Sequence, residues 1–392
     1  MSYLAASLVT LYPNTRSVQL FAHIDKRSTP PKQVVQTLSR AVRGWGKLVH
    51  GSFTILDARA YKHLCRLKTL TSLRICIHNN YAPIQAAKLP AVPFSALTDV
   101  NTQARTITDL VQLINRHNHF PLVSNLTCEV EVARSQLLGL RPYDLCKSIA
   151  ARFRCQSLQR VHLRLRFRIR KIVVHLNAIR PLFVFSRLRS VNLSGFCMLS
   201  LDDNELEILA SSWPLLEELN LSRRVLPKHK HFVQIPTFTG LFKLIEHCPR
   251  LRVLTIVIDV RDIAGIGIQK PCGYACTRMV SQLDLSSSLI NDLEQVASIL
   301  KAIFPLLKEV YVDTLPQDDS SGHPRKEFNI RHTNLIYRCG EREAYEQDQS
   351  YRCLSPRAIR RYWCFVRSLL TYAHGFRRLW HYQLCSENVC PL

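Results

Sequence analysis

Apolar residues recur along this chain in a short pattern, apolar-x-x-apolar-x-apolar, which follows a helix-like stretch. The clearest copies also carry a proline and read HFPLVSNLTC, SWPLLEELNL, HCPRLRVLTI and IFPLLKEVYV, at 119–128, 212–221, 247–256 and 303–312. Weaker copies lie at 154–163, 185–193 and 279–285, and two N-terminal stretches, 15–20 and 70–75, fit the same frame. Such internal repetition indicates a solenoid in which each copy contributes one strand.

The spacing of the copies indicates the type of repeat. The first apolar position of each copy lies 27 to 35 residues after the previous one. These spacings are near or somewhat above the leucine-rich-repeat period of roughly 20–29 residues. We expect the additional residues to form helices and loops on the outer side. The anchoring positions are Val123, Leu158, Leu188, Leu216, Leu251, Val280 and Leu307.

The stretches between the predicted strands have the features of helices. Asp292 can cap a helix, with Gln295 completing a capping-box pattern, and Thr108 and Thr237 precede similar apolar periods. Prolines then stop the helices, because proline cannot donate the next helical hydrogen bond. These prolines are Pro121, Pro214, Pro249 and Pro305.

This alternation predicts an α/β leucine-rich-repeat solenoid over residues 1–315, with a curved parallel sheet inside and helices outside. An ordinary α/β domain with coincidental similarity is the alternative. It is disfavoured because four copies keep both the proline and the phase of the strand. Met1 stands in what reads as the end of a helix, so we expect an irregular N-terminal part that starts in the middle of a repeat.

Residues 316–392 do not fit the repeat. A charged loop is followed by Ser355 and Pro356, which can open a helix with Ile359, Trp363 and Leu370 on one side. We expect a basic helical cap on the last repeat, because solenoids need an end that covers their core. The alternative is an amphipathic helix for a membrane surface or an acidic partner.

The repeat region resembles a known family. The stretches LDDNELEILASSWPLLEELNLSRR, TGLFKLIEHCPRLRVLTIVID and QVASILKAIFPLLKEVYV are similar to the leucine-rich repeats of basidiomycete F-box-like proteins, over about residues 185–315. The resemblance implies the substrate-recognition arm of a cullin-type ubiquitin ligase, with a ligase adaptor as partner if an F-box is present. No F-box segment is visible before the repeats, and the asparagine that usually follows the repeat strand is absent.

Side chains that alternate with the apolar strand positions should line the concave face of the sheet. They are cationic at one end, on the strand that begins near 160, neutral in the middle and anionic at the far end. We predict a partner-binding surface there, made by Arg160, His162, Arg164, Arg166, Asn192, Glu218, Asn220, Thr255, Asp284 and Tyr311.

The segment HLRLRFRIRK at 162–171 alternates apolar and basic residues, which places its arginines on one strand face. At intervals of roughly 6.6 Å, these arginines repel one another unless an anionic group lies over them. We therefore predict a protein segment with acidic residues over Arg160, Arg164 and Arg166. A solvated charged face, paired with acidic loops, is the equally weighted alternative.

The formal net charge of +24 favours anionic partners, whether nucleic acid, acidic protein or membrane surface. Nucleic-acid binding is an alternative function, disfavoured because the basic residues are spread over several regions without a recognised motif. We find no apolar run that could span a bilayer and no signal peptide, so a cytoplasmic or nuclear location is expected.

The sequence predicts neither catalysis nor a cofactor. No phosphate loop, HExxH, GxSxG or carboxylate dyad is present, and GIGIQKPCG at 265–273 lacks the residues of a nucleotide loop. The fourteen cysteines lack zinc spacing, and we expect buried reduced thiols, as at Cys76, Cys128 and Cys248. The sequons at Asn125, Asn192 and Asn220 fall in predicted strands. Histidines such as His117, His119 and His247 are explained by the dipoles of adjacent helix ends.

Overall fold

The structure is a computed structural model of the 392-residue chain. It describes residues 14–20, 32–54, 56–77, 93–132, 141–167, 173–194, 198–221, 233–262 and 279–312. The predicted loop and cap at 316–392 lie outside the described residues, as do the arginines at 168 and 170 of the basic segment.

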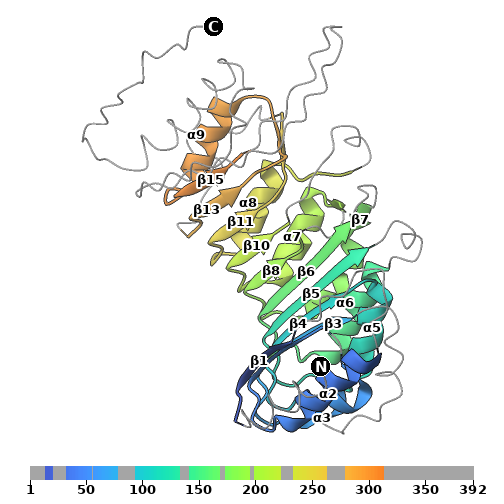
Figure 1. Cartoon of the computed structure of the whole chain (residues 1–392). Helices are drawn as coiled ribbons and strands as arrows, with labels where there is room; N and C mark the ends of the chain where they lie inside the picture. Colours follow the sequence, from blue (N-terminus) through green and yellow to red (C-terminus); the bar gives the residue numbers. More distant parts are fainter. Residues whose placement is uncertain are drawn as a thin grey trace, which may run out of the picture.

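Eleven strands in the described part of the chain form one parallel sheet, and their order in the sheet follows their order along the chain. Figure 1 shows them side by side, from β1 at the N-terminal end to β15. The chain is therefore the α/β leucine-rich-repeat solenoid that its periodicity predicts. The strands are β1 Ser17–Leu20, β2 His50–Phe53, β3 Ser72–Ile77, β4 Asp99–Ala104, β5 Asn125–Val132, β6 Arg160–Phe167, β8 Ser190–Asn192, β10 Glu218–Asn220, β11 Val253–Thr255, β13 Gln282–Asp284 and β15 Glu309–Tyr311.

Helices follow most of the strands and cover one face of the sheet (Figure 1). The α-helices are α2 Lys32–Gly44, α3 Ala58–Arg66, α5 Ile107–Asn115, α6 Pro142–Arg152, α7 Asp203–Ser212, α8 Phe238–His247 and α9 Leu293–Ile303. Two short 3₁₀-helices, η2 Leu176–Ala178 and η3 Arg180–Val184, replace an α-helix between β6 and β8. Two small parallel pairs accompany the main sheet: β7 Val173–His175 with β9 Met198–Ser200, and β12 Asp259–Val260 with β14 Leu289–Ile290.

The predicted helix boundaries are confirmed in part. The Asp292 carboxylate accepts from the Gln295 amide at 3.0 Å, and Thr237 caps α8. The cap of α5 is Thr106, not Thr108, because its hydroxyl accepts from the Asp109 amide at 3.0 Å.

The predicted proline stops are also confirmed in part. Pro214, Pro249 and Pro305 each stand just beyond the last residue of a helix. Pro121 does not stop α5, which already ends at Asn115. Between that end and the proline, the Phe120 amide donates to the Arg152 carbonyl at 2.7 Å, which ties the turn to α6.

One apolar core runs the length of the described sheet. The predicted anchors Leu188, Leu216 and Leu251 lie two residues before β8, β10 and β11, and each is fully buried. The central residues of β10 and β11, Leu219 and Leu254, are equally buried. The predicted continuous spine of adjacent parallel strands is confirmed, and hydrophobic burial along it is the main stabilising term of the fold.

Backbone hydrogen bonds join neighbouring repeats at the start of each strand. The Arg189 carbonyl accepts from two successive amides of the next repeat, Glu217 at 2.7 Å and Glu218 at 2.9 Å. The Glu217 carbonyl does the same for Arg252 and Val253. This arrangement is repeated from β1 to β15, so the polar groups at the start of each strand are satisfied by the neighbouring repeat.

The sequence pattern missed strands β2 and β4. Strand β4 directs Val100, Thr102 and Ala104 inward, and β2 directs Gly51 and Phe53 inward, so neither shows the leucine pattern. Five strands consequently precede β6 in the sheet. The arginine-bearing strand therefore lies at the centre of the sheet, which corrects the expectation that it forms one end of the binding face.

Candidate binding surface

The helix-free face of the sheet, here called the open face, carries the side chains that alternate with the buried ones. The strand registers align these side chains in rows across the sheet. The first row contains Arg160, Ser190, Glu218, Val253, Gln282 and Glu309. The second row contains His162, Asn192, Asn220, Thr255, Asp284 and Tyr311.

Eight of the ten predicted surface residues lie in these two rows. The other two, Arg164 and Arg166, lie further along β6, opposite Glu129 and Glu131 of β5 in the strand register. The side chain of Arg166 lies outside the described part of the structure. Sequence periodicity therefore predicted that these residues share one face of the sheet. Their neighbours on the adjacent strands are known only from the strand register.

The arginines of β6 lie beside glutamates of β5. An Nη1 atom of Arg164 is 3.6 Å from Oε1 of Glu129, with 46% of the arginine side chain exposed. An exposed pair of this kind contributes at most about 1 kcal/mol. The segments EVEV at 129–132 and RLRF at 164–167 alternate in the same phase, but only the strand register pairs Glu129 with Arg164.

A short hydrogen-bonded chain connects β6, β8 and β10 across the first two rows. Nε2 of His162 lies 3.4 Å from Oγ of Ser190, and this hydroxyl donates to Oε2 of Glu218 at 2.8 Å. Burial lowers the pKa of His162, and the Glu218 carboxylate opposes that shift. The acid contacts the serine and not the histidine, and Ser190 is only 4% exposed, so this set lacks the geometry of a nucleophilic triad.

On the C-terminal side of β8, the charged side chains of the two rows are all carboxylates. Oε2 of Glu309 accepts from Nε2 of Gln282 at 2.9 Å and from the hydroxyl of Tyr311 at 3.0 Å. Oδ1 of Asp284 accepts from the Ser286 amide at 2.9 Å. The second-row residue Asn192 uses its Oδ1 in the same way, accepting from the Ser194 amide at 2.9 Å. Asn192 and Asp284 thus also shape the turns that end their strands.

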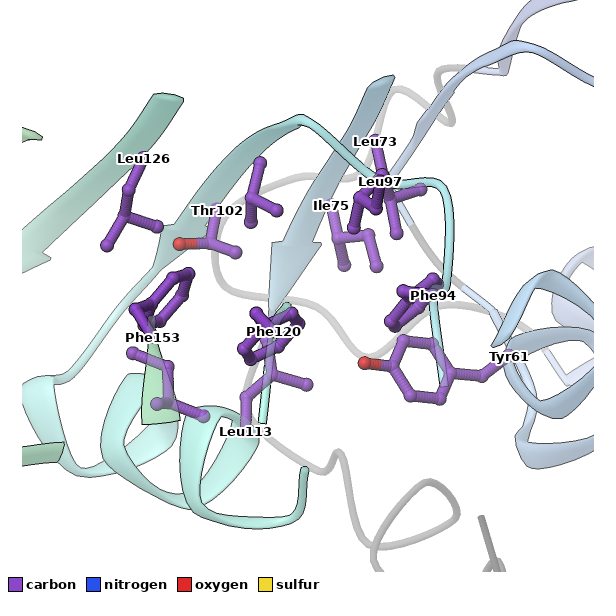
Figure 2. A pocket seen from close by; sticks show the side chains of 12 residues that line it. Tyr61, Leu73, Ile75, Phe94, Leu97, Thr102, Leu113, Phe120, Leu126 and Phe153 are labelled. Atoms are coloured by element: carbon purple, nitrogen blue, oxygen red, sulfur yellow. The ribbon is translucent and has the colours of Figure 1, made fainter. Parts of the chain in front are cut away.

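A small apolar cavity lies inside the fold, between the sheet and α5. Figure 2 shows its lining, in which Tyr61 and Thr102 are the labelled side chains that carry an oxygen. The cavity has a volume of about 20 Å³, which is room for about one water molecule. It is a packing defect among Phe94, Phe120 and Phe153 and has no space for an organic ligand.

The described cysteines follow the expectation of buried thiols with two exceptions, Cys76 and Cys155. Cys128 and Cys248 are buried, and burial raises the pKa of each thiol to about 12. Cys76 lies on the open face and is half-buried, with its Sγ donating to Oε1 of Gln103 at 3.1 Å. Cys155 is exposed. Among the described residues, no group of three or more histidine, cysteine, aspartate or glutamate side chains is arranged to hold a metal ion.

None of the described helices combines the length and apolar character required to cross a bilayer.

Comparison with known proteins gives a structural likeness and no sequence family. No family model matches the chain, and no curated protein matches it. Among solved structures, an internalin from Listeria monocytogenes is similar, with 13% sequence identity and a TM-score of 0.36. The match covers 72% of this chain and 71% of that chain.

Proposed function

We propose that this chain is a non-catalytic protein-binding module whose open face holds a segment of a partner protein. The observation that carries the proposal is the continuous open face of a parallel sheet, on which charged and polar side chains are aligned in rows by the strand register. Repeat solenoids use such extended surfaces for binding. The side chains proposed for contact come from strands β6 to β15, so a partner segment would cross several strands.

Acidic residues of the partner would lie over the basic part of β6. Arg160 is exposed, and among the described residues no ion pair reaches its guanidinium. Arg164 stays accessible despite its contact with Glu129, since nearly half of its side chain is exposed. Arg166 shares the strand and is proposed on the alternation of the sequence alone.

The finer proposal is a substrate-recognition arm of an F-box-type ubiquitin ligase, or a remnant of one. Its support is the resemblance of residues 185–315 to F-box-like repeat proteins. Affinity purification of the full chain should recover the adaptor of a cullin-type ligase. If the adaptor is absent from preparations that do contain a partner, the ligase role is refuted and general protein binding remains.

Binding of nucleic acid or another polyanion is the alternative function, favoured by the net charge of +24. The open face gives it little support, because Glu129, Glu218 and Glu309 would repel a phosphate backbone laid across the strands. Retention on heparin that disappears at modest salt would indicate plain electrostatics. Strong retention with a nucleic-acid sequence preference would replace the protein-binding proposal.

Charge reversal tests the proposed surface. The triple variant Arg160→Glu, Arg164→Glu and Arg166→Glu should recover at least about tenfold less of the partner, because three favourable pairs become repulsive. The measurement is quantitative affinity purification with chemical crosslinking, which compares the proteins recovered by each variant.

The matched control is Arg252→Glu, which makes the same kind of charge change at an exposed position before β11, outside the two rows. It should recover the partner as the unmodified chain does. Equal recovery by the triple variant and the control would remove the arginines of β6 from the binding surface.

A further inference from the structure

The open face carries opposite charges on the two sides of strand β8. On β6 it presents Arg160 and Arg164, whereas β10, β13 and β15 present Glu218, Asp284 and Glu309. Among the described open-face residues from β8 to β15, there is no lysine, arginine or histidine. This half is therefore anionic in a chain whose formal net charge is +24.

Two of these carboxylates are held in place by neutral neighbours. Glu218 and Glu309 each use Oε2 to accept hydrogen bonds, from Ser190 in the first case and from Gln282 and Tyr311 in the second. In the described part of the chain, no cationic side chain forms an ion pair with either carboxylate. Their charge is thus fixed in position and not neutralised locally, which lowers the ordering cost of an incoming cation.

The strand register sets the distances between these charges. Arg160, Glu218 and Glu309 lie in the same row. Neighbouring strands are about 4.8 Å apart, so Glu218 lies roughly 10 Å from Arg160 and Glu309 roughly 14 Å further. An extended chain advances about 3.3 Å per residue, so these intervals correspond to about three and about four residues.

We infer that the partner segment is bipolar: an extended stretch whose acidic residue faces Arg160 and whose basic residues, about three and seven positions away, face Glu218 and Glu309. The inference rests on the proposed function, because it states the charge pattern of the segment held by that same face. A uniformly acidic segment would meet repulsion from β10 onward, and a uniformly basic one would meet it at β6.

A display library of random twelve-residue peptides tests this charge pattern, with the full chain immobilised at low salt. Enriched peptides should contain an acidic residue and basic residues at about these spacings. Their affinity should fall at least about tenfold between 50 mM and 500 mM salt, because exposed charges are screened.

Protein variants connect the selected peptides to the two glutamates. The double variant Glu218→Lys with Glu309→Lys should bind the selected peptides with at least about tenfold lower affinity. Peptides in which the basic residues are replaced by aspartate should bind this variant more tightly than the selected peptides do. Glu218→Gln with Glu309→Gln keeps hydrogen-bond acceptors at both positions and should show an intermediate loss. Glu246→Lys, exposed on α8 on the helical side, is the matched control and should bind as the unmodified chain does.

The outcomes separate this inference from the proposed function. Enrichment of uniformly acidic peptides, sensitive to Arg160→Glu but not to the glutamate reversals, would overturn the bipolar pattern and leave the binding face in place. Failure to enrich any peptide, or equal loss in Glu246→Lys, would also overturn it. The proposed function is tested independently by recovery of the native partner.

Discussion

At the scale of single residues, His117 shows how tertiary burial changes a sequence interpretation. Its place beside a helix end suggested a charged side chain favoured by the helix dipole, but the ring is only 1% exposed. Nε2 of His117 is 2.7 Å from the Tyr61 hydroxyl, and the ring lies 4.8 Å from Phe120, centroid to centroid. Burial, with a smaller effect of Arg116, lowers the pKa of His117 to about 3, so the imidazole is neutral in the folded protein.

The depressed pKa of His117 predicts acid sensitivity. The ordinary pKa of histidine is about 6.5, so the unfolded chain binds a proton at a pH where the folded chain does not. The stability contribution of the neutral ring is fully present above pH 6.5 and is lost as the pH falls toward 3. Between pH 6.5 and pH 4.5 we expect a loss of roughly 2 kcal/mol from this group.

Urea unfolding at a series of pH values measures this effect. His117→Phe, which keeps a ring in the aromatic cluster, should flatten the pH dependence between 6.5 and 4.5, although it removes a partner of Tyr61. His119→Phe, at an exposed position two residues later, should keep the slope of the unmodified chain. An unchanged slope in His117→Phe would show that other groups cause the acid sensitivity.

At the scale of elements, the contact between α7 and α8 depends on the two aspartates that begin α7. Asp202 caps α7, and its capping box with Glu205 is complete. Asp203 accepts from the amide and the hydroxyl of Thr237, both at 2.7 Å, and Thr237 is the cap of α8. Asp203 at the start of α7 thus fixes the position of Thr237 at the start of α8. The apolar pattern of the strands did not predict this contact between repeats.

Gly240 permits this close approach. A Cβ atom there would lie 2.5 Å from Oδ1 and 3.1 Å from Cα of Asp203. Gly240→Ala should gain about 1 kcal/mol of helix propensity but lose more, since relief of the clash would displace the carboxylate that holds Thr237. We expect a net loss of about 1–2 kcal/mol in the free energy of unfolding, measured by urea denaturation.

Gly46 provides the matched glycine control, because a Cβ there would meet no atom within 4 Å. Gly46→Ala should change stability by less than about 0.5 kcal/mol. A Gly240→Ala variant more stable than the unmodified chain would show that α7 and α8 can move apart at Asp203 without a loss of stability.

At the scale of the whole molecule, the spine is evenly buried until its last described strand. Leu251, which precedes β11, is fully buried, whereas Leu307 at the same repeat position before β15 is only partly buried. The central residue of β15, Val310, is also only partly buried. A fully buried side chain contacts apolar neighbours on every side, and a partly buried one has fewer such contacts.

Truncation of these two leucines tests this gradient. Leu251→Ala should cost about 2–5 kcal/mol, as expected for a fully buried leucine, because it removes apolar contact and leaves a cavity. Leu307→Ala should cost about half as much or less. Equal losses in the free energy of unfolding, measured in urea, would indicate that Leu307 is as fully enclosed as Leu251.

The sequence by itself determined the repeat, the parallel direction of the strands and the face on which each strand residue lies. These properties depend on local periodicity, since alternation along a strand decides which side chains are buried. It also predicted the caps at Asp292 and Thr237, whose signals lie within three residues of one another.

Only the tertiary structure decided which strands are neighbours and what lies beside each charge. Strands β2 and β4 carry too few large apolar residues for a local signal. They nevertheless pair with the strands on both sides, so that Arg160 lies at the centre of the sheet. The Arg164–Glu129 contact and the burial of His117 against Tyr61 join residues far apart in sequence. Because intervening helices and loops vary in length, periodicity cannot assign such pairs, and the register of the assembled sheet does.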